Sequence, residues 1–79
     1  MPTRVWTPKV NGIPYTVVAR WNPGTFAGEL VVDGAIIRKW GLMMAGPDIN
    51  FKIEGQSGSL RKTPLGFDLY IDEKKIRYQ

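Results

Sequence analysis

The stretch GELVVDGAIIRKW, residues 28–40, decides the fold of this 79-residue chain. A run rich in branched apolar residues leads into Asp33-Gly34, and a second such run leads out and ends at Trp40. Asp-Gly between two runs of this kind is a strong hairpin signal, because a tight two-residue turn requires positive φ angles that these residues tolerate. The stretch therefore predicts two antiparallel strands joined by a turn.

The same pattern of short apolar runs and turn residues continues on both sides of this hairpin. Asn11-Gly12 predicts a turn between strands at residues 4–10 and 13–21. Apolar and polar side chains alternate over residues 49–54, which is typical of a strand buried on one face. Further turns are expected at residues 55–58, 64–66 and 73–74, and further strands at residues 59–63, 67–72 and 75–78. About eight short strands predict an all-β fold, a compact antiparallel β-sandwich in which residues 1–79 form one domain.

The predicted core consists mainly of apolar side chains that recur at every second position of these strands. In the decisive hairpin the choice between Ile36 and Ile37 depends on a β-bulge, which reverses the side that each one faces, and Ile37 is assigned to the core. The full predicted core comprises Tyr15, Val17, Trp21, Leu30, Val32, Ile37, Trp40, Phe51, Ile53, Leu60, Phe67, Leu69, Ile71 and Ile76.

Composition excludes several classes of function. The chain has no cysteine and no histidine, which removes thiol chemistry, the commonest general base and the commonest transition-metal ligand. Its formal charge of +4 comes from eleven basic and seven acidic residues, a mild excess that permits contact with an acidic surface without demanding one. No apolar run is long enough to span a membrane, and the first residues do not resemble a signal peptide. We therefore expect a cytoplasmic protein with no membrane partner.

The side chains that would be needed for catalysis or metal binding do not form a recognisable motif. Ser57 and Ser59 have no histidine partner, so the usual catalytic triad is excluded. Asp68, Asp72 and Glu73 are the best candidates for calcium ligands, but their spacing matches no known calcium loop. Carboxylates in turns and on outward strand faces occur there without any catalytic need. We therefore expect no enzyme, no cofactor and no metal site.

Four motifs, in the order of the predicted strands, resemble one repeat of the Fas apoptotic inhibitory molecule (FAIM) family. They are a strand running into Asp-Gly at 31–34, a basic-Trp ending at 37–40, a Phe-x-Ile strand reaching glycine at 51–55, and an aromatic strand leading to a turn and lysine at 66–76. The resemblance covers residues 13–76. Trp40, at the fitting distance from the Asp-Gly turn, is its most specific element.

The chain also departs from the FAIM pattern. Glu54 intervenes before Gly55, Glu73-Lys74 replaces Asn-Gly at the last turn, and one unit is present where the animal proteins have two. The resemblance implies an antiparallel sandwich of about eight strands that acts as a non-enzymatic protein-interaction module, and it transfers no catalytic residue. The animal family is linked to regulation of cell death and to limiting protein aggregation under stress, and a single unit need not share either role.

We therefore expect a protein that binds another protein or, weakly, a second copy of itself. The contact is expected at an edge strand or at a patch of large side chains outside the firmly placed strands. The candidates for this patch are Trp6, Phe26, Met43 and Met44. Contiguous apolar residues on a surface mark partner sites, but the same side chains are equally suited to closing the ends of the core.

A small basic β-module that binds single-stranded nucleic acid is the alternative, because sheets that present aromatic rings beside cations stack bases and hold phosphates. The candidate contacts are Arg20, Arg38, Arg61 and Lys62. Since the aromatic rings are needed for the core of so small a domain, and carboxylates interrupt the basic residues, protein binding is the favoured hypothesis. A third hypothesis, carbohydrate binding on Trp21 or Trp40, requires that one of these rings be exposed.

Overall fold

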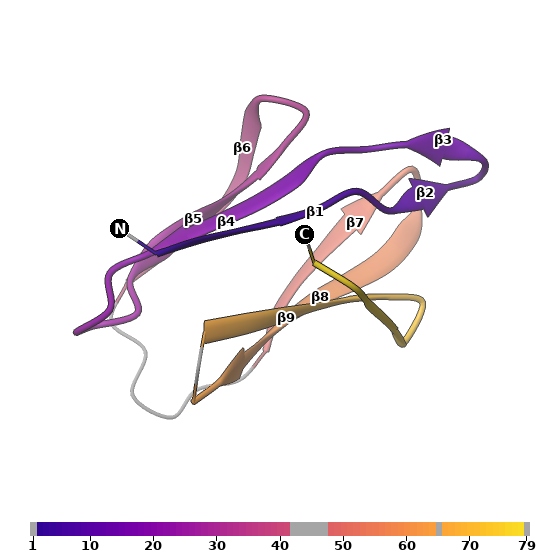
Figure 1. The fold of residues 1–79 in the computed structure, drawn as a ribbon. Coiled ribbons are helices and arrows are strands. Elements are labelled where there is room, and N and C mark those ends of the chain that lie inside the picture. The colour runs from indigo at the N-terminus through magenta and orange to yellow at the C-terminus, as the bar shows by residue number, and fades with distance from the viewer. Residues whose placement is uncertain (1, 42–47, 65, 79) are drawn as a thin grey trace.

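The computed structural model describes residues 2–41, 48–64 and 66–78. These residues form ten β-strands in antiparallel sheets and no helix, which confirms the predicted all-β class (Figure 1). The strands are β1 (Thr3–Trp6), β2 (Lys9–Val10), β3 (Ile13–Pro14), β4 (Val17–Trp21), β5 (Gly28–Val32), β6 (Ala35–Trp40), β7 (Ile49–Ile53), β8 (Gln56–Thr63), β9 (Gly66–Ile71) and β10 (Lys74–Ile76).

The strands form two four-stranded sheets and a small extension. The first sheet has the order β1-β4-β5-β6, the second has the order β10-β9-β8-β7, and β2 pairs with β3 beyond the end of the first sheet. Figure 1 shows the two sheets as facing layers, with β1 to β6 in one layer and β7 to β9 in the other. Each sheet therefore comes from one continuous half of the chain, and β6 and β7 are the outermost strands where the halves meet.

The structure has ten strands rather than eight because long predicted strands are interrupted. The sequence predicts continuous strands at residues 4–10 and 13–21, but the pairing lapses at residues 7–8 and 15–16. Pro8 has no N–H to donate to a sheet, and its carbonyl accepts the Tyr15 N–H at 2.9 Å. β1 and β2 thus replace one predicted strand, and β3 and β4 replace another.

Two-residue turns with positive φ at both positions fix the register of the first hairpins. The φ angles are 53° and 78° at Asn11-Gly12, and 49° and 86° at Asp33-Gly34. These angles are typical of the turn whose twist matches that of antiparallel strands, so both predicted turns are confirmed. The Asp33 carboxylate also accepts the Thr16 N–H at 2.8 Å, which ties the second turn to the neighbouring hairpin.

Two other turns lie earlier in the chain than predicted. The turn expected at residues 55–58 is formed by Glu54-Gly55, and the turn expected at residues 73–74 is formed by Asp72-Glu73, again with positive φ throughout. The first prediction was wrong because Gly58 is not a turn residue: it is buried in β8, opposite Phe51. The second was wrong because Glu73, with φ of 65°, occupies a conformation that glycine or asparagine adopts more readily.

The core lies between the sheets and is centred on Phe67 of β9. The ring of Phe67 makes edge-to-face contacts with Trp21, Phe26 and Trp40, with ring centroids 5.3, 6.0 and 5.4 Å away. Every residue of the predicted core is buried or packed against the buried cluster. Among the described residues, five further side chains are buried that the prediction did not include: Trp6, Pro8, Val10, Ala19 and Val31.

A β-bulge in β6 decides which isoleucine faces the core. Ile36 pairs with Val31 and Arg38 pairs with Leu30, so Ile37 is the extra residue on β6. Ile37 is half-buried and packs against the core, whereas Ile36 is 51% exposed. The assignment of Ile37 to the core is therefore confirmed, although β6 contains a bulge of the kind that could have reversed it.

The two sheets meet on one side in what we call the closed seam, which is built from Arg4, Trp6, Phe67, Asp68 and Tyr78. Trp6 of β1 forms an antiparallel bridge with Tyr78. Arg4 donates from Nη1 to the Phe67 carbonyl at 2.9 Å and lies 3.6 Å from an oxygen of Asp68. Its guanidinium also stacks over the Tyr78 ring, 3.9 Å from the centroid. The closed seam thus joins the sheets by backbone, ionic and aromatic contacts.

Candidate binding site

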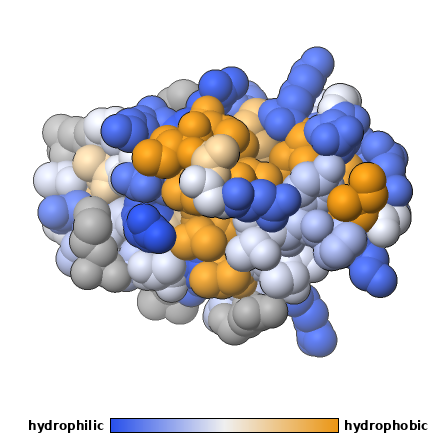
Figure 2. Space-filling model, turned by 90° about the horizontal axis from the view of Figure 1, so that it is seen from above, coloured by the Kyte–Doolittle hydropathy of each residue, from blue (hydrophilic) through white to orange (hydrophobic). Residues whose placement is uncertain are grey.

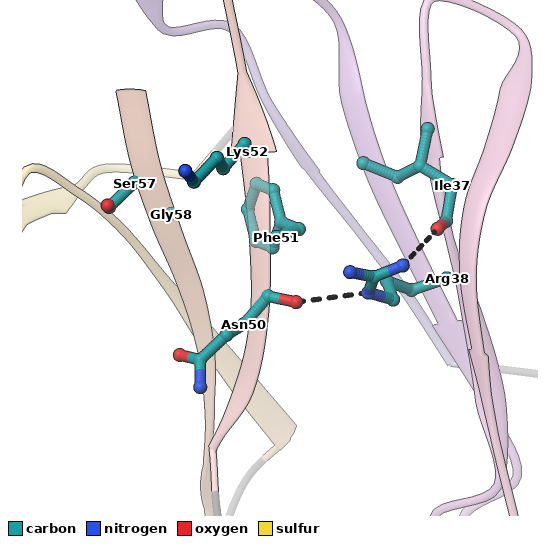
Figure 3. Close-up of a pocket in the computed structure, with 7 residues that line it drawn as sticks. All are labelled: Ile37, Arg38, Asn50, Phe51, Lys52, Ser57 and Gly58. Atoms are coloured by element: carbon teal, nitrogen blue, oxygen red, sulfur yellow. Dashed lines mark hydrogen bonds between the residues drawn. The ribbon is translucent and has the colours of Figure 1, made fainter. Parts of the chain in front are cut away.

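On the opposite side the sheets do not pair, and a groove of about 510 Å³ lies between β6 and β7. We call this groove the open seam. Its residues come from the edge strands of both sheets and from β8, as Figure 3 shows. The lining residues are Ile37, Arg38, Asn50, Phe51, Lys52, Ser57 and Gly58. The open seam is thus bordered by the outermost strand of each sheet.

The bulge in β6 brings two consecutive side chains to the open seam. In a regular strand neighbouring residues point to opposite faces, but a bulge changes this alternation. Figure 3 shows Ile37 and Arg38 both extending from β6 towards β7. Arg38 donates from Nε to the Asn50 carbonyl at 3.0 Å and from Nη1 to the Ile37 carbonyl at 3.3 Å. One exposed side chain therefore spans the groove.

The backbone groups of β7 that face the open seam follow from its register with β8. The pair Ile53 and Gln56 closes a two-residue turn and is therefore hydrogen-bonded. Hydrogen-bonded and non-hydrogen-bonded pairs alternate along antiparallel strands, so the N–H and C=O of Asn50 and Lys52 point away from β8. The bond from Arg38 to the Asn50 carbonyl agrees with this alternation.

The floor of the open seam is apolar and closely packed. Phe51 is only 4% exposed and lies opposite the buried Gly58. A Cβ atom at position 58 would lie 2.5 Å from Cε2 of the Phe51 ring, so only glycine leaves room for the ring in this position. Ile37 packs against the same core from the β6 side. The groove thus offers an apolar floor below exposed backbone.

The charges that line the open seam are of one sign. Its lining residues include two exposed cations, Arg38 and Lys52, and no carboxylate. Two acidic residues flank β7 outside this lining: Asp48 lies 3.3 Å from Arg61, and Glu54 lies close enough to Tyr15 to affect its hydroxyl. Burial, together with this interaction with Glu54 and the charge of the carboxylates nearby, raises the pKa of the Tyr15 hydroxyl above its usual value. The groove is therefore suited to an anionic ligand.

Of the four predicted partner-binding side chains, the structure describes Trp6 and Phe26, and it does not expose these two as a patch. Trp6 is completely buried in the closed seam, because it fills the space between β1 and the end of the chain, and it closes the core instead of offering a contact. Phe26 is half-buried, packs on Phe67 and lies beneath Lys62, whose Nζ is 4.5 Å from the ring centroid. Met43 and Met44 lie outside the described residues.

Three of the four cations proposed for nucleic-acid binding are engaged with other side chains. Arg20 lies 3.7 Å from Glu29, Arg61 lies 3.3 Å from Asp48 and over the ring of Tyr70, and Lys62 lies over Phe26. Arg61 and Lys62 are consecutive on β8, so they point to opposite faces of the sheet. Of the four, Arg38 alone lines the open seam.

Sequence reasoning missed an apolar row on the outer face of the first sheet. Val5, Val18, Val31 and Ile36 are successive cross-strand partners on β1, β4, β5 and β6. Seen from above, the molecule carries apolar surface bordered by hydrophilic side chains (Figure 2). The signal was present in the sequence as apolar residues on both faces of β4 and β5, and the row ends at the edge strand β6.

Known proteins give no further guide to the site. No family model, curated protein or solved structure matches the chain, so the resemblance to a FAIM repeat stays a prediction. Within residues 2–41, 48–64 and 66–78, no group of three or more metal-binding side chains is placed to hold an ion. The same residues contain no helix that would cross a membrane.

Proposed function

We propose that this protein is a non-enzymatic protein-interaction module that binds its partner through the strand edges at the open seam. The observation that carries this proposal is the pair of outermost strands, β6 and β7, that face each other across a groove without pairing. An exposed strand edge presents rows of N–H and C=O groups that pair readily with another chain. This function is also the one that the resemblance to a FAIM repeat implies.

The aromatic residues support protein binding over the two alternatives. Trp6 and Trp21 are 0% and 4% exposed, and the faces of Phe26 and Tyr70 are covered by cations of the chain itself. Stacking of bases or sugars requires free ring faces. Trp40 is half-buried, packs on Phe67 and donates from Nε1 to the Phe26 carbonyl at 2.6 Å, so it is held in the core.

The proposal is tested by capturing proteins from a lysate of the source organism, treated with nuclease, on the immobilised chain. Asn50→Pro is compared with Asn50→Ala, because only proline removes the N–H that faces the open seam. We expect proteins that survive nuclease treatment and bind Asn50→Ala but not Asn50→Pro. Capture that is lost with nuclease, or equal capture by both variants, would contradict the proposal.

A further inference from the structure

We infer that the open seam binds an extended acidic peptide, which adds to β7 as a further strand and carries apolar side chains at alternate positions. This inference rests on the proposed function and names the class of partner. It draws on four features of the groove: the direction of the β7 backbone, the apolar floor, the sign of the lining charges, and the side chain of Arg38.

The β7 backbone presents the groups that an added strand requires. Asn50 and Lys52 direct their N–H and C=O groups into the open seam, as the register with β8 dictates. At present the Asn50 carbonyl accepts the Arg38 side chain at 3.0 Å. A guanidinium N–H therefore occupies the acceptor that a backbone N–H of an added strand would use.

The floor of the groove sets the pattern of the peptide. Phe51 and Ile37 line the groove from β7 and β6, and both pack against the core. Side chains of a strand alternate between its faces, so every second residue of an added strand would lie over these apolar groups. The residues between them would lie on the outer side, beside Lys52. The matching sequence alternates between apolar and charged residues.

The lining charges set the sign of the peptide. Arg38 and Lys52 are both exposed, and no lining residue of the groove is acidic. A carboxylate of the peptide would accept hydrogen bonds from the Arg38 guanidinium once this group leaves the Asn50 carbonyl. In the complex, a peptide N–H replaces Arg38 as the donor to the Asn50 carbonyl, and Arg38 donates to a carboxylate of the peptide instead.

The same charges disfavour a second copy of the chain as the occupant. Antiparallel pairing of two β6 strands would bring Arg38 and Lys39 of each copy close to the same residues of the other. Full antiparallel pairing of two β7 strands would set Lys52 opposite Asn50 of the other copy and so place two lysines on one face of the same strand pair. Like charges directly opposite each other destabilise a strand pair, and lysine on an edge strand discourages pairing of identical edges.

The test measures binding of three labelled peptides of about eight residues, a length within the usual range for strands, by fluorescence anisotropy. One alternates valine with glutamate, one valine with glutamine, and one valine with lysine. We expect the glutamate peptide to bind at least about tenfold more tightly than the glutamine peptide, because only glutamate sets a negative charge beside Arg38 and Lys52, and we expect the lysine peptide not to bind because its charges repel these cations. Equal binding of the glutamate and glutamine peptides would overturn the inference.

A pair of double variants tests whether the charge of the groove, rather than of the whole chain, is responsible. The double variant Arg38→Gln with Lys52→Gln should bind the glutamate peptide about tenfold or more weakly than the unchanged chain does. Lys9→Gln with Lys74→Gln makes the same change in net charge at exposed positions on β2 and β10, and should leave the affinity within about twofold. An equal loss in both double variants would overturn the inference, because it would show attraction to net charge alone.

Amide hydrogen exchange locates the added strand without any substitution. Saturation with the glutamate peptide should slow exchange at Asn50 and Lys52, whose N–H groups face the groove, more than at Phe51, whose N–H faces β8. Slower exchange elsewhere, with these two amides unchanged, would overturn the inference. Protection of these amides that rises with protein concentration in the absence of peptide would indicate a second copy as the occupant and would also overturn the inference. Displacement of the peptide by an oligonucleotide of equal length at equal concentration would overturn it as well.

The outcomes separate the inference from the proposed function. If the glutamine peptide or a captured protein slows exchange at Asn50 and Lys52 while the glutamate peptide does not, the seam binds proteins but the acidic class is wrong. If no peptide slows exchange at these amides and capture does not depend on the Asn50→Pro substitution, both proposals are wrong.

Discussion

The closed seam and the open seam join the same two sheets in different ways. In the closed seam, Trp6 bridges to Tyr78, and Arg4 contacts a carbonyl, a carboxylate and an aromatic ring. Trp6 is completely buried and the side chains of Arg4 and Asp68 are less than a fifth exposed, although Tyr78 itself is exposed. In the open seam, one exposed arginine reaches across a groove to a single carbonyl. Buried groups lose much when a partner is removed, whereas exposed ones lose little. The closed seam therefore contributes more to holding the fold, and the open seam is the one that we propose binds a partner.

The largest effect that distinguishes the seams is expected at Trp6. Trp6→Ala removes a completely buried indole from the closed seam and should lower the free energy of unfolding by about 3–5 kcal/mol, measured by chemical denaturation. Trp6→Phe is the matched control. Its loss should be clearly smaller, because it keeps an aromatic ring and removes an indole N–H that has no hydrogen-bond partner in the described part of the chain. A loss below about 1 kcal/mol for alanine would show that this seam does not hold the fold.

The next largest effect is expected at Arg4. Arg4→Met keeps the apolar part of the side chain but leaves the Phe67 carbonyl without its side-chain donor, and should cost about 1–3 kcal/mol of unfolding free energy. Arg20→Met is the control, since Arg20 makes only an exposed ion pair with Glu29, and should cost less than about 0.5 kcal/mol. Both variants are measured by thermal and chemical denaturation. Equal losses of unfolding free energy in Arg4→Met and Arg20→Met would argue against a special role for Arg4.

A comparable or slightly smaller effect is expected at Gly58, in the floor of the open seam. The added methyl group of Gly58→Ala meets the Phe51 ring at 2.5 Å, so the ring must shift, at a cost of about 1–3 kcal/mol. Because the shifted ring enters the groove, the same variant should bind the glutamate peptide more weakly. Gly41→Ala makes the same change at an exposed position where the new Cβ meets nothing within 4 Å, and should change neither stability nor affinity appreciably. Unchanged stability of Gly58→Ala would show that the floor is loosely packed.

The smallest effect on stability is expected at Arg38. Arg38→Gln removes the exposed contact across the open seam and should change the unfolding free energy by less than about 0.5 kcal/mol. The same substitution should weaken binding of the glutamate peptide. Arg38→Gln should thus lower affinity with little loss of stability, whereas Arg4→Met should lower stability. A loss of stability above about 1 kcal/mol would mean that Arg38 holds the sheets together and that the two seams are alike.

Much of the fold was predictable because its strands are encoded locally. Alternation in residues 49–53 and the turns at Asn11-Gly12 and Asp33-Gly34 placed the strands and their buried faces correctly. The burial of Trp6 was not predictable, because residues 3–6 show no clear alternation and the chain closes over this side only in three dimensions. The role of Gly58 was missed for the same reason: this glycine leaves room for the Phe51 ring on the neighbouring strand and does not form a turn.

The open seam was only partly predictable. Binding through an edge strand was expected, and Arg38 was selected as a cation, but for contact with nucleic acid. Which strands become edges depends on which sheet each strand joins, and that follows from packing rather than from any short motif. The two adjacent isoleucines of β6 raised the question of a bulge, but the sequence did not show whether one would form or where, and the structure places it at Ile37.

The continuity of each sheet along the chain has a consequence for synthesis on the ribosome. All pairing partners of the first sheet lie within residues 3–40, so this sheet has its full set of strands before the second half has been translated. Contacts between neighbours in sequence form quickly. Until β7 to β10 follow, however, the inner face of the nascent sheet has no cover, and β6 is its most recently made edge. At that stage the positive charges of Arg38 and Lys39 disfavour pairing of β6 with the same strand of another nascent chain.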